Sequence, residues 1–147
     1  MDSTGLWSRW PVRLGAGLAA GAAIATVDSF AFEGEVSPIV IVAMLLAAAV
    51  TSGVVWGRRG WVAAATAWAC VPLAHLIKHV LGLPDTLQPN TYASILMLAA
   101  FTLAVATIGT GCGVLLRRVT TAAADGGRKE TYPKGVEREA LPRPSAL

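Results

Sequence analysis

Four long apolar runs constrain what this chain can fold into. They cover residues 12–32, 37–57, 61–83 and 91–116. An α-helix rises about 1.5 Å per residue, so crossing the roughly 30 Å apolar core of a bilayer takes about 20 residues. Each run meets this length. We therefore predict an all-α, polytopic membrane protein with four transmembrane helices in an up-down bundle.

The composition agrees with a membrane protein of one domain. Apolar residues make up 54% of the 147 residues and charged residues only 14%, against about 25% charged in soluble domains. We expect residues 1–118 to form the transmembrane domain. Residues 119–147 are dominated by Gly, Pro and charged side chains. Such a segment buries too little surface to order itself, so we predict a disordered cytoplasmic tail.

Basic residues predict the orientation of the four helices. Three arginine pairs fall on one side of the predicted topology: Arg9 and Arg13, Arg58 and Arg59, and Arg117 and Arg118. The connections on the other side contain no Lys or Arg. By the positive-inside rule both termini are cytoplasmic, and the net charge of +3 does not indicate nucleic-acid binding. The Ala- and Arg-rich composition favours a bacterial inner membrane.

The first run has a second interpretation. Arg9 and Arg13, the apolar stretch after them and the sequence 23–25 (Ala-Ile-Ala) imitate a cleavable signal peptide. The apolar character continues to residue 32, which favours a retained helix. Cleavage would leave three helices in the same orientation.

The third run contains both histidines and Lys78, the only lysine in the four runs; Arg13 lies at the very start of the first run. His75, Lys78 and His79 are spaced i, i+3 and i+4, so they share one face of a helix. Titratable groups at membrane depth are expensive, and they commonly serve a function. Asp28 lies at a similar depth in the first run, and we expect it to pair with Lys78 or a protonated His79. Three further polar side chains enter from the same side: Gln88, Asn90 and Tyr92.

This group has a structural and a functional interpretation. It is either a polar cluster that fixes the helices together, or a ligand, proton or metal site. His75 and His79 are the candidate metal ligands, because histidines at i and i+4 can chelate one ion. Lys78 lies between them and argues against a metal, because a fixed cation repels it. We expect no cofactor.

Small residues predict where helices pack. Gly17 and Gly21 form a GxxxG pattern, and Gly109 and Gly113 repeat the spacing in the last run. In lipid, such residues let two helices approach closely.

The sequence favours a non-enzymatic role, because it shows no CxxC, no Gly-rich phosphate loop and no nucleophile set. We expect a subunit, accessory protein or scaffold whose partners are the lipid bilayer and either a second copy or other membrane helices. The alternative is an oligomeric transporter or proton-coupled carrier that uses Asp28, His75, Lys78 and His79. The third possibility is a metal-binding protein or one that acts on a lipid or quinone.

Overall fold

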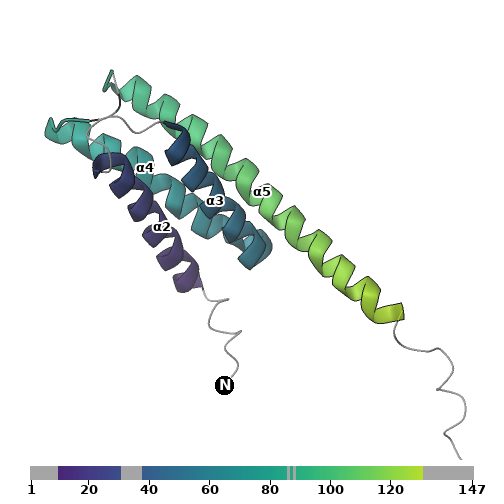
Figure 1. Cartoon of the computed structure of the whole chain (residues 1–147). Helices are drawn as coiled ribbons and strands as arrows, with labels where there is room; N and C mark the ends of the chain where they lie inside the picture. Colours follow the sequence, from purple (N-terminus) through teal and green to yellow (C-terminus); the bar gives the residue numbers. More distant parts are fainter. Residues whose placement is uncertain (1–9, 31–37, 86, 88, 131–147) are drawn as a thin grey trace, which may run out of the picture. The chain divides into compact units, whose positions relative to one another are not determined.

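A computed structural model of the chain describes residues 10–30, 38–85, 87 and 89–130. Within these residues every regular element is helical and no strand is present. The elements, in chain order, are α2 (Trp10–Phe30), α3 (Pro38–Trp56), the 3₁₀ turn η1 (Gly57–Gly60), α4 (Trp61–Leu81) and α5 (Tyr92–Glu130) (Figure 1).

Local sequence explains several of these boundaries. Pro38 is the first residue of α3, where its missing N–H leaves no helical bond unmade. Gly82 ends α4 in the left-handed region, at φ +64°, which a residue without Cβ adopts readily. Before α5, the Thr91 hydroxyl accepts a hydrogen bond from the backbone N–H of Ser94 at 3.2 Å. This is the cap expected of threonine at a helix start.

Contacts between residues divide the chain into two compact units, Met1–Arg117 and Arg118–Leu147. The second unit begins with helix, because α5 continues to Glu130. Residues 119–130 are therefore helical, whereas their composition predicts a disordered tail. Residues 122–124 are all alanine, the strongest helix former, which favours this continuation. The rest of the predicted tail, residues 131–147, lies outside the described residues.

Three helical segments in the described residues are long and apolar enough to cross a membrane: Trp10–Ser29, Ile39–Leu81 and Tyr92–Ala124. The second has 43 residues, about twice the length that one crossing needs. It contains α3, η1 and α4, so the predicted runs 37–57 and 61–83 fall within a single segment. The fourth separate span expected from the sequence is thus not among the three.

Within that segment the chain turns at η1, and α3 and α4 pack against each other. Gly57 has φ +58°, a conformation that glycine adopts without steric cost. The Arg117 guanidinium donates a hydrogen bond to the carbonyl of Val55 at 2.8 Å. This bond satisfies one of the carbonyls left free at the end of α3.

The α2–α4 interface contains the first pair of predicted packing glycines. A Cβ on Gly17 would meet the backbone oxygen of Ala63, and one on Gly21 would lie 2.7 Å from that of Ala67. Gly17 lies against Ala63, and Gly21, four residues later on α2, lies against Ala67, four residues later on α4. The two helices therefore run in the same direction. The two backbones approach so closely only because glycine has no side chain.

The α3–α5 interface contains the second pair. A Cβ on Gly109 would lie 2.9 Å from the Cβ of Ala49, and one on Gly113 would meet the backbone oxygen of Val50. The opposing helix contributes its own glycine, since a Cβ on Gly53 would lie 2.5 Å from the carbonyl oxygen of Thr110.

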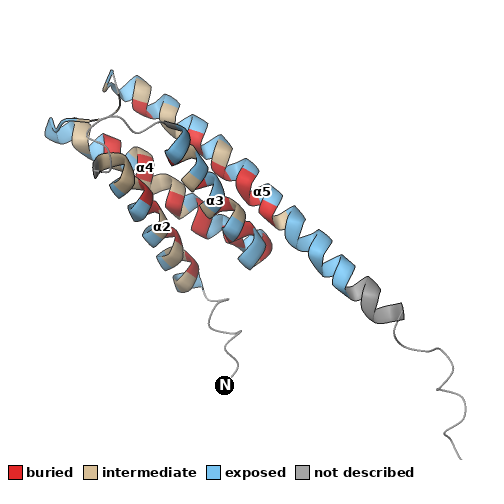
Figure 2. Cartoon of the chain, in the orientation of Figure 1, coloured by how far each residue is buried: buried red, intermediate tan, exposed pale blue. Residues whose placement is uncertain are grey.

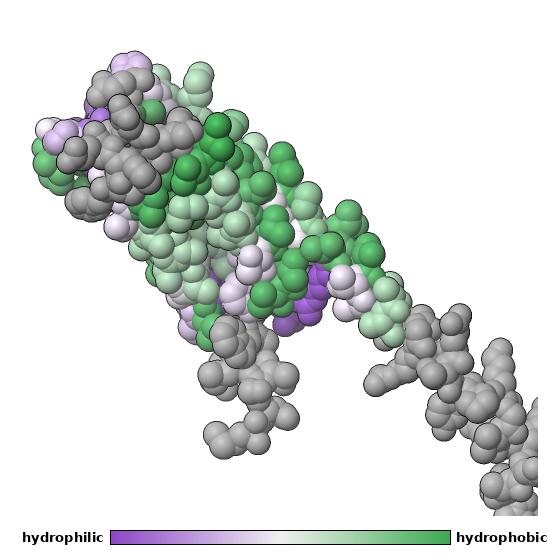
Figure 3. All heavy atoms as spheres, in the orientation of Figure 1, coloured by the Kyte–Doolittle hydropathy of each residue, from purple (hydrophilic) through white to green (hydrophobic). Residues whose placement is uncertain are grey.

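The interior of the first unit is built from small and aliphatic side chains. Figure 2 shows the buried residues on the helix faces that meet one another and the exposed residues on the outer faces. One buried group contains Ile24, Ile41, Leu45 and Val71, and a second contains Ala49, Ala64 and Ala106. On the face drawn in Figure 3, hydrophobic side chains also cover most of the described outer surface, as suits contact with lipid.

Candidate functional site

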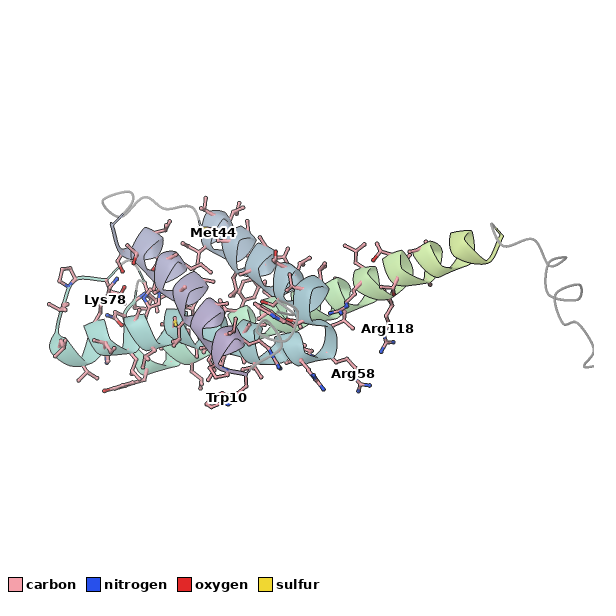
Figure 4. All side chains as sticks on the ribbon, turned by 90° about the horizontal axis from the view of Figure 1, so that it is seen from below. Trp10, Met44, Arg58, Lys78 and Arg118 are labelled. Carbon is pink, nitrogen blue, oxygen red and sulfur yellow. The ribbon has the colours of Figure 1, made fainter. Side chains whose placement is uncertain are left out.

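One group of charged side chains lies where α2 and α4 end. We call Asp28, His75, Lys78 and Asp85 the polar cluster. Asp28 comes from the last turns of α2, His75 and Lys78 from α4, and Asp85 from the segment after α4. In Figure 4, Lys78 lies at this end of the first unit, and Trp10 and Arg58 lie at the opposite end.

His75 is the centre of the polar cluster. Its Nδ1 lies 2.8 Å from Oδ1 and 2.9 Å from Oδ2 of Asp85. Its Nε2 lies 3.2 Å from Oδ2 of Asp28. Both ring nitrogens are therefore within hydrogen-bond distance of a carboxylate, and the imidazole side chain is only 5% exposed.

The ammonium group of Lys78 also contacts Asp85. Lys78 Nζ donates to Asp85 Oδ1 at 3.4 Å, and the Asp85 side chain is completely buried. Burial raises the pKa of the Asp85 carboxyl. The hydrogen bond from His75 and the charges of His75 and Lys78 outweigh that effect, so the pKa lies below the ordinary value of 3.8.

The end of α4 explains how Asp85 reaches the cluster. The left-handed Gly82 donates to the carbonyl of His79, and the N–H of Leu83 donates to the carbonyl of Lys78 at 2.9 Å. These two bonds form a Schellman-type cap, which reverses the chain direction. Asp85 then lies back over the preceding turns of α4, next to His75.

The pairing differs from the one expected from the sequence. From its depth, Asp28 is expected to pair with Lys78 or a protonated His79, whereas the structure places Asp28 against His75 and Lys78 against Asp85. Asp85 is not among the site residues that the sequence predicts. One signal could have identified it: no other acidic residue occurs in the sequence between positions 36 and 124.

His79 lies apart from these ion pairs. Its ring contacts the Tyr92 ring edge-to-face, with centroids 4.4 Å apart and planes at 77°. Of the other polar residues expected nearby, Gln88 lies outside the described residues. Asn90 has a buried Oδ1 without a hydrogen-bond partner.

The geometry does not favour chelation of a metal by His75 and His79. Both nitrogens of His75 already face carboxylates, and His79 faces an aromatic ring. Among the described residues, no three His, Cys, Asp or Glu side chains are arranged to hold a metal ion.

A second set of polar contacts joins α4 to α5. Trp68 Nε1 lies 3.0 Å from the carbonyl oxygen of Ala99 and 3.1 Å from the hydroxyl of Thr102. Beside it is an apolar groove of about 370 Å³ between the two helices. Its lining residues are Trp68, Ala69, Pro72, Leu73, Leu76, Tyr92, Ile95, Leu96 and Ala99.

Comparison with known protein families, with curated proteins and with solved structures finds no match for this chain.

Proposed function

We propose that this chain is a multi-pass membrane protein with four crossings and both termini in the cytoplasm. The turn at η1 supports two crossings within Ile39–Leu81, because α3 and α4 pack against each other on either side of it. The arginine pairs support the orientation. The composition favours a bacterial inner membrane.

We further propose that its role is non-catalytic, as a subunit, accessory protein or scaffold of a membrane complex. The observation that carries this proposal is that the members of the polar cluster bond to one another. Such a cluster joins α2 to α4 and the segment after it. The outer faces present large exposed apolar side chains such as Leu73, Leu96 and Phe101, which suit contact with helices of a partner or second copy.

Native mass spectrometry of the full chain, extracted in a mild detergent, tests the role. The expected result is a discrete assembly, either several copies or a fixed complex with another membrane protein. A monomer at every detergent concentration, despite retained helicity, would contradict the proposal.

Cysteine labelling in intact cells tests the topology. In a Cys70→Ser, Cys112→Ser background, Leu87→Cys should react with a membrane-impermeant maleimide and Arg59→Cys should not. The reverse pattern would overturn the orientation. Reaction at both positions would overturn the two crossings assigned to Ile39–Leu81.

A second candidate function is an oligomeric proton-coupled carrier. The observation that favours it is the imidazole between two carboxylates, since these groups exchange protons readily. The groove that lies near these groups is apolar. Among the described residues that line it, polar side chains do not extend a proton path across the membrane. Transport would therefore need a second copy to complete it.

A further inference from the structure

A pair of arginines forms the tip of the turn between α3 and α4. Arg58 and Arg59 occupy the middle of η1, and both are exposed. The glycines on either side of them, Gly57 and Gly60, are buried. A Cβ on Gly60 would meet the backbone oxygen of Ser52, so the turn lies directly against the end of α3. The turn therefore presents two guanidinium groups on a closely packed backbone, and in Figure 4 the Arg58 side chain extends away from the helices.

Two further arginines approach the same turn. The guanidinium of Arg117 lies beside Gly57, because a Cβ at that position would be 3.3 Å from its Nη1. On α2, Arg13 precedes Gly17 by four residues. Since α2 and α4 run in the same direction from the contact of Gly17 with Ala63, Arg13 lies level with η1. Positive groups from three segments that are distant in the sequence therefore lie near one turn.

The charge at this end of the first unit has one sign among the described residues. The described part of the first unit contains two acidic residues, Asp28 and Asp85, and both belong to the polar cluster at the opposite end. The cations near η1 are all arginines, whose planar guanidinium can donate two parallel hydrogen bonds to one phosphate group. Arg58 and Arg59 are exposed, so a ligand can reach them from outside the bundle.

Tryptophans place the turn at the depth of lipid headgroups. Trp56 precedes η1 and Trp61 follows it, and Trp61 is 41% exposed. Trp10, at the start of α2, is 66% exposed. Tryptophan is enriched at the interface between the membrane and water, where its apolar ring and its polar N–H are both accommodated. This depth favours the phosphate of a lipid over an acidic segment of a protein as the ligand of Arg58 and Arg59.

We propose that Arg58 and Arg59 form a binding site for anionic phospholipids, whose phosphate groups they contact at the membrane interface. The inference rests on the proposed crossings on either side of η1, and it depends neither on the scaffold role nor on the orientation. Successive residues of a 3₁₀ helix point about 120° apart, so the two side chains leave η1 in different directions. Each guanidinium therefore binds a phosphate of its own, and the two contributions should be separable.

Spin-labelled lipids test the selectivity of the site. The full chain is reconstituted in phosphatidylcholine bilayers with a trace of spin-labelled phosphatidylglycerol or of spin-labelled phosphatidylcholine. The association constant of the anionic lipid should exceed that of the zwitterionic lipid at least about five-fold, the factor expected from one basic residue near the membrane surface. Equal association constants would overturn the proposal and would favour an acidic segment of a partner protein as the ligand.

Glutamine variants locate the selectivity. Arg58→Gln and Arg59→Gln should each lower the ratio of the two association constants at least about two-fold, and the double variant should bring the ratio close to one. The matched control is Lys78→Gln, which removes a cation from the opposite end and should leave the ratio unchanged. An unchanged ratio in the double variant, or an equal fall in Lys78→Gln, would overturn the proposal.

Solid-state NMR measures the contact itself in the unmodified chain. With labelled arginine in phosphatidylglycerol bilayers, dipolar coupling should be detected between guanidinium carbons and lipid phosphorus. The coupling should weaken in the double variant Arg58→Gln, Arg59→Gln. Absence of the coupling in the unmodified chain would overturn the proposal even if the variants failed to fold.

The spin-label spectra also separate this inference from the proposed crossings. Lipids beside a transmembrane bundle are immobilised whatever their headgroup. A spectrum without any immobilised component would therefore contradict the crossings and the lipid site together. An immobilised component with equal association constants for the two lipids would contradict the lipid site alone.

Discussion

The two ends of the α2–α4 interface are held together by different interactions. Near the start of both helices, Gly17 and Gly21 bring the α2 backbone against Ala63 and Ala67. Near their ends, the Asp28 carboxylate lies 3.2 Å from His75 Nε2. The free energy of unfolding should therefore fall when side-chain atoms are added at the glycine end. It should also fall when charged groups are removed from the polar end.

The largest effect is expected from removing the central imidazole. His75→Leu removes the polar ring that lies between the carboxylates of Asp28 and Asp85. We expect the free energy of unfolding to fall by about 3–5 kcal/mol, measured by SDS-induced unfolding in mixed micelles. The matched control is His79→Leu, which removes a ring contact worth about 1 kcal/mol. Equal losses in the two variants would show that His75 is not the centre of the cluster.

Adding a single methyl group at the glycine end should have the next largest effect. Gly21→Ala places a Cβ 2.7 Å from the Ala67 oxygen and from the Cys70 sulfur, and should cost about 1–3 kcal/mol. In Gly15→Ala the new Cβ meets nothing within 4 Å. Alanine favours helix over glycine by about 1 kcal/mol, so this control should be neutral or stabilising. A stabilising Gly21→Ala would mean that the two backbones do not touch.

Acid should weaken the polar end and leave the glycine end unaffected. The pKa of Asp85 lies below its ordinary value of 3.8. Asp85 therefore stabilises the fold above about pH 4, and this contribution is lost as the pH falls through its lowered pKa. The free energy of unfolding should decrease on acidification in this range, and Asp85→Asn should flatten the dependence. An unchanged slope in Asp85→Asn would place the acid-sensitive group elsewhere.

The smallest effect is expected where α4 meets α5. Trp68→Phe removes the hydrogen bonds to Ala99 and Thr102. Hydrogen bonds between membrane helices average about 0.6 kcal/mol, and we expect a loss of that size in the same unfolding assay. Trp61→Phe, at an exposed position at the start of α4, is the control and should change little. A loss as large as that of His75→Leu would make α4–α5 the principal polar contact.

The glycine end could be predicted from the sequence because its pattern is local. Small residues four apart lie on one face of a helix whatever the rest of the chain does. The positions Gly17, Gly21, Gly109 and Gly113 follow from spacing alone, and the structure places all four at helix contacts. The bounds of α5 could not be predicted in this way, because the apolar run stops near residue 116 while the alanines at 122–124 extend the helix.

The polar end could be predicted only in part. Helical spacing and depth bring Asp28, His75 and Lys78 to one region. The position of Asp85 depends on the path of the chain after Gly82, which is set by two capping hydrogen bonds. Spacing predicts that His79 belongs to the cluster, but its ring contacts Tyr92 at the start of α5. The periodicity of one helix cannot predict side-chain partners that another segment of the chain supplies.

A double-mutant cycle between Asp28→Ala and His75→Leu tests the central claim most directly. If the two side chains bond across α2 and α4, the double variant should lose less stability than the sum of the single variants. The expected coupling is on the order of 1 kcal/mol, whereas Asp28→Ala and His79→Leu should be additive. Additivity between Asp28→Ala and His75→Leu would show that the polar cluster does not join the two helices.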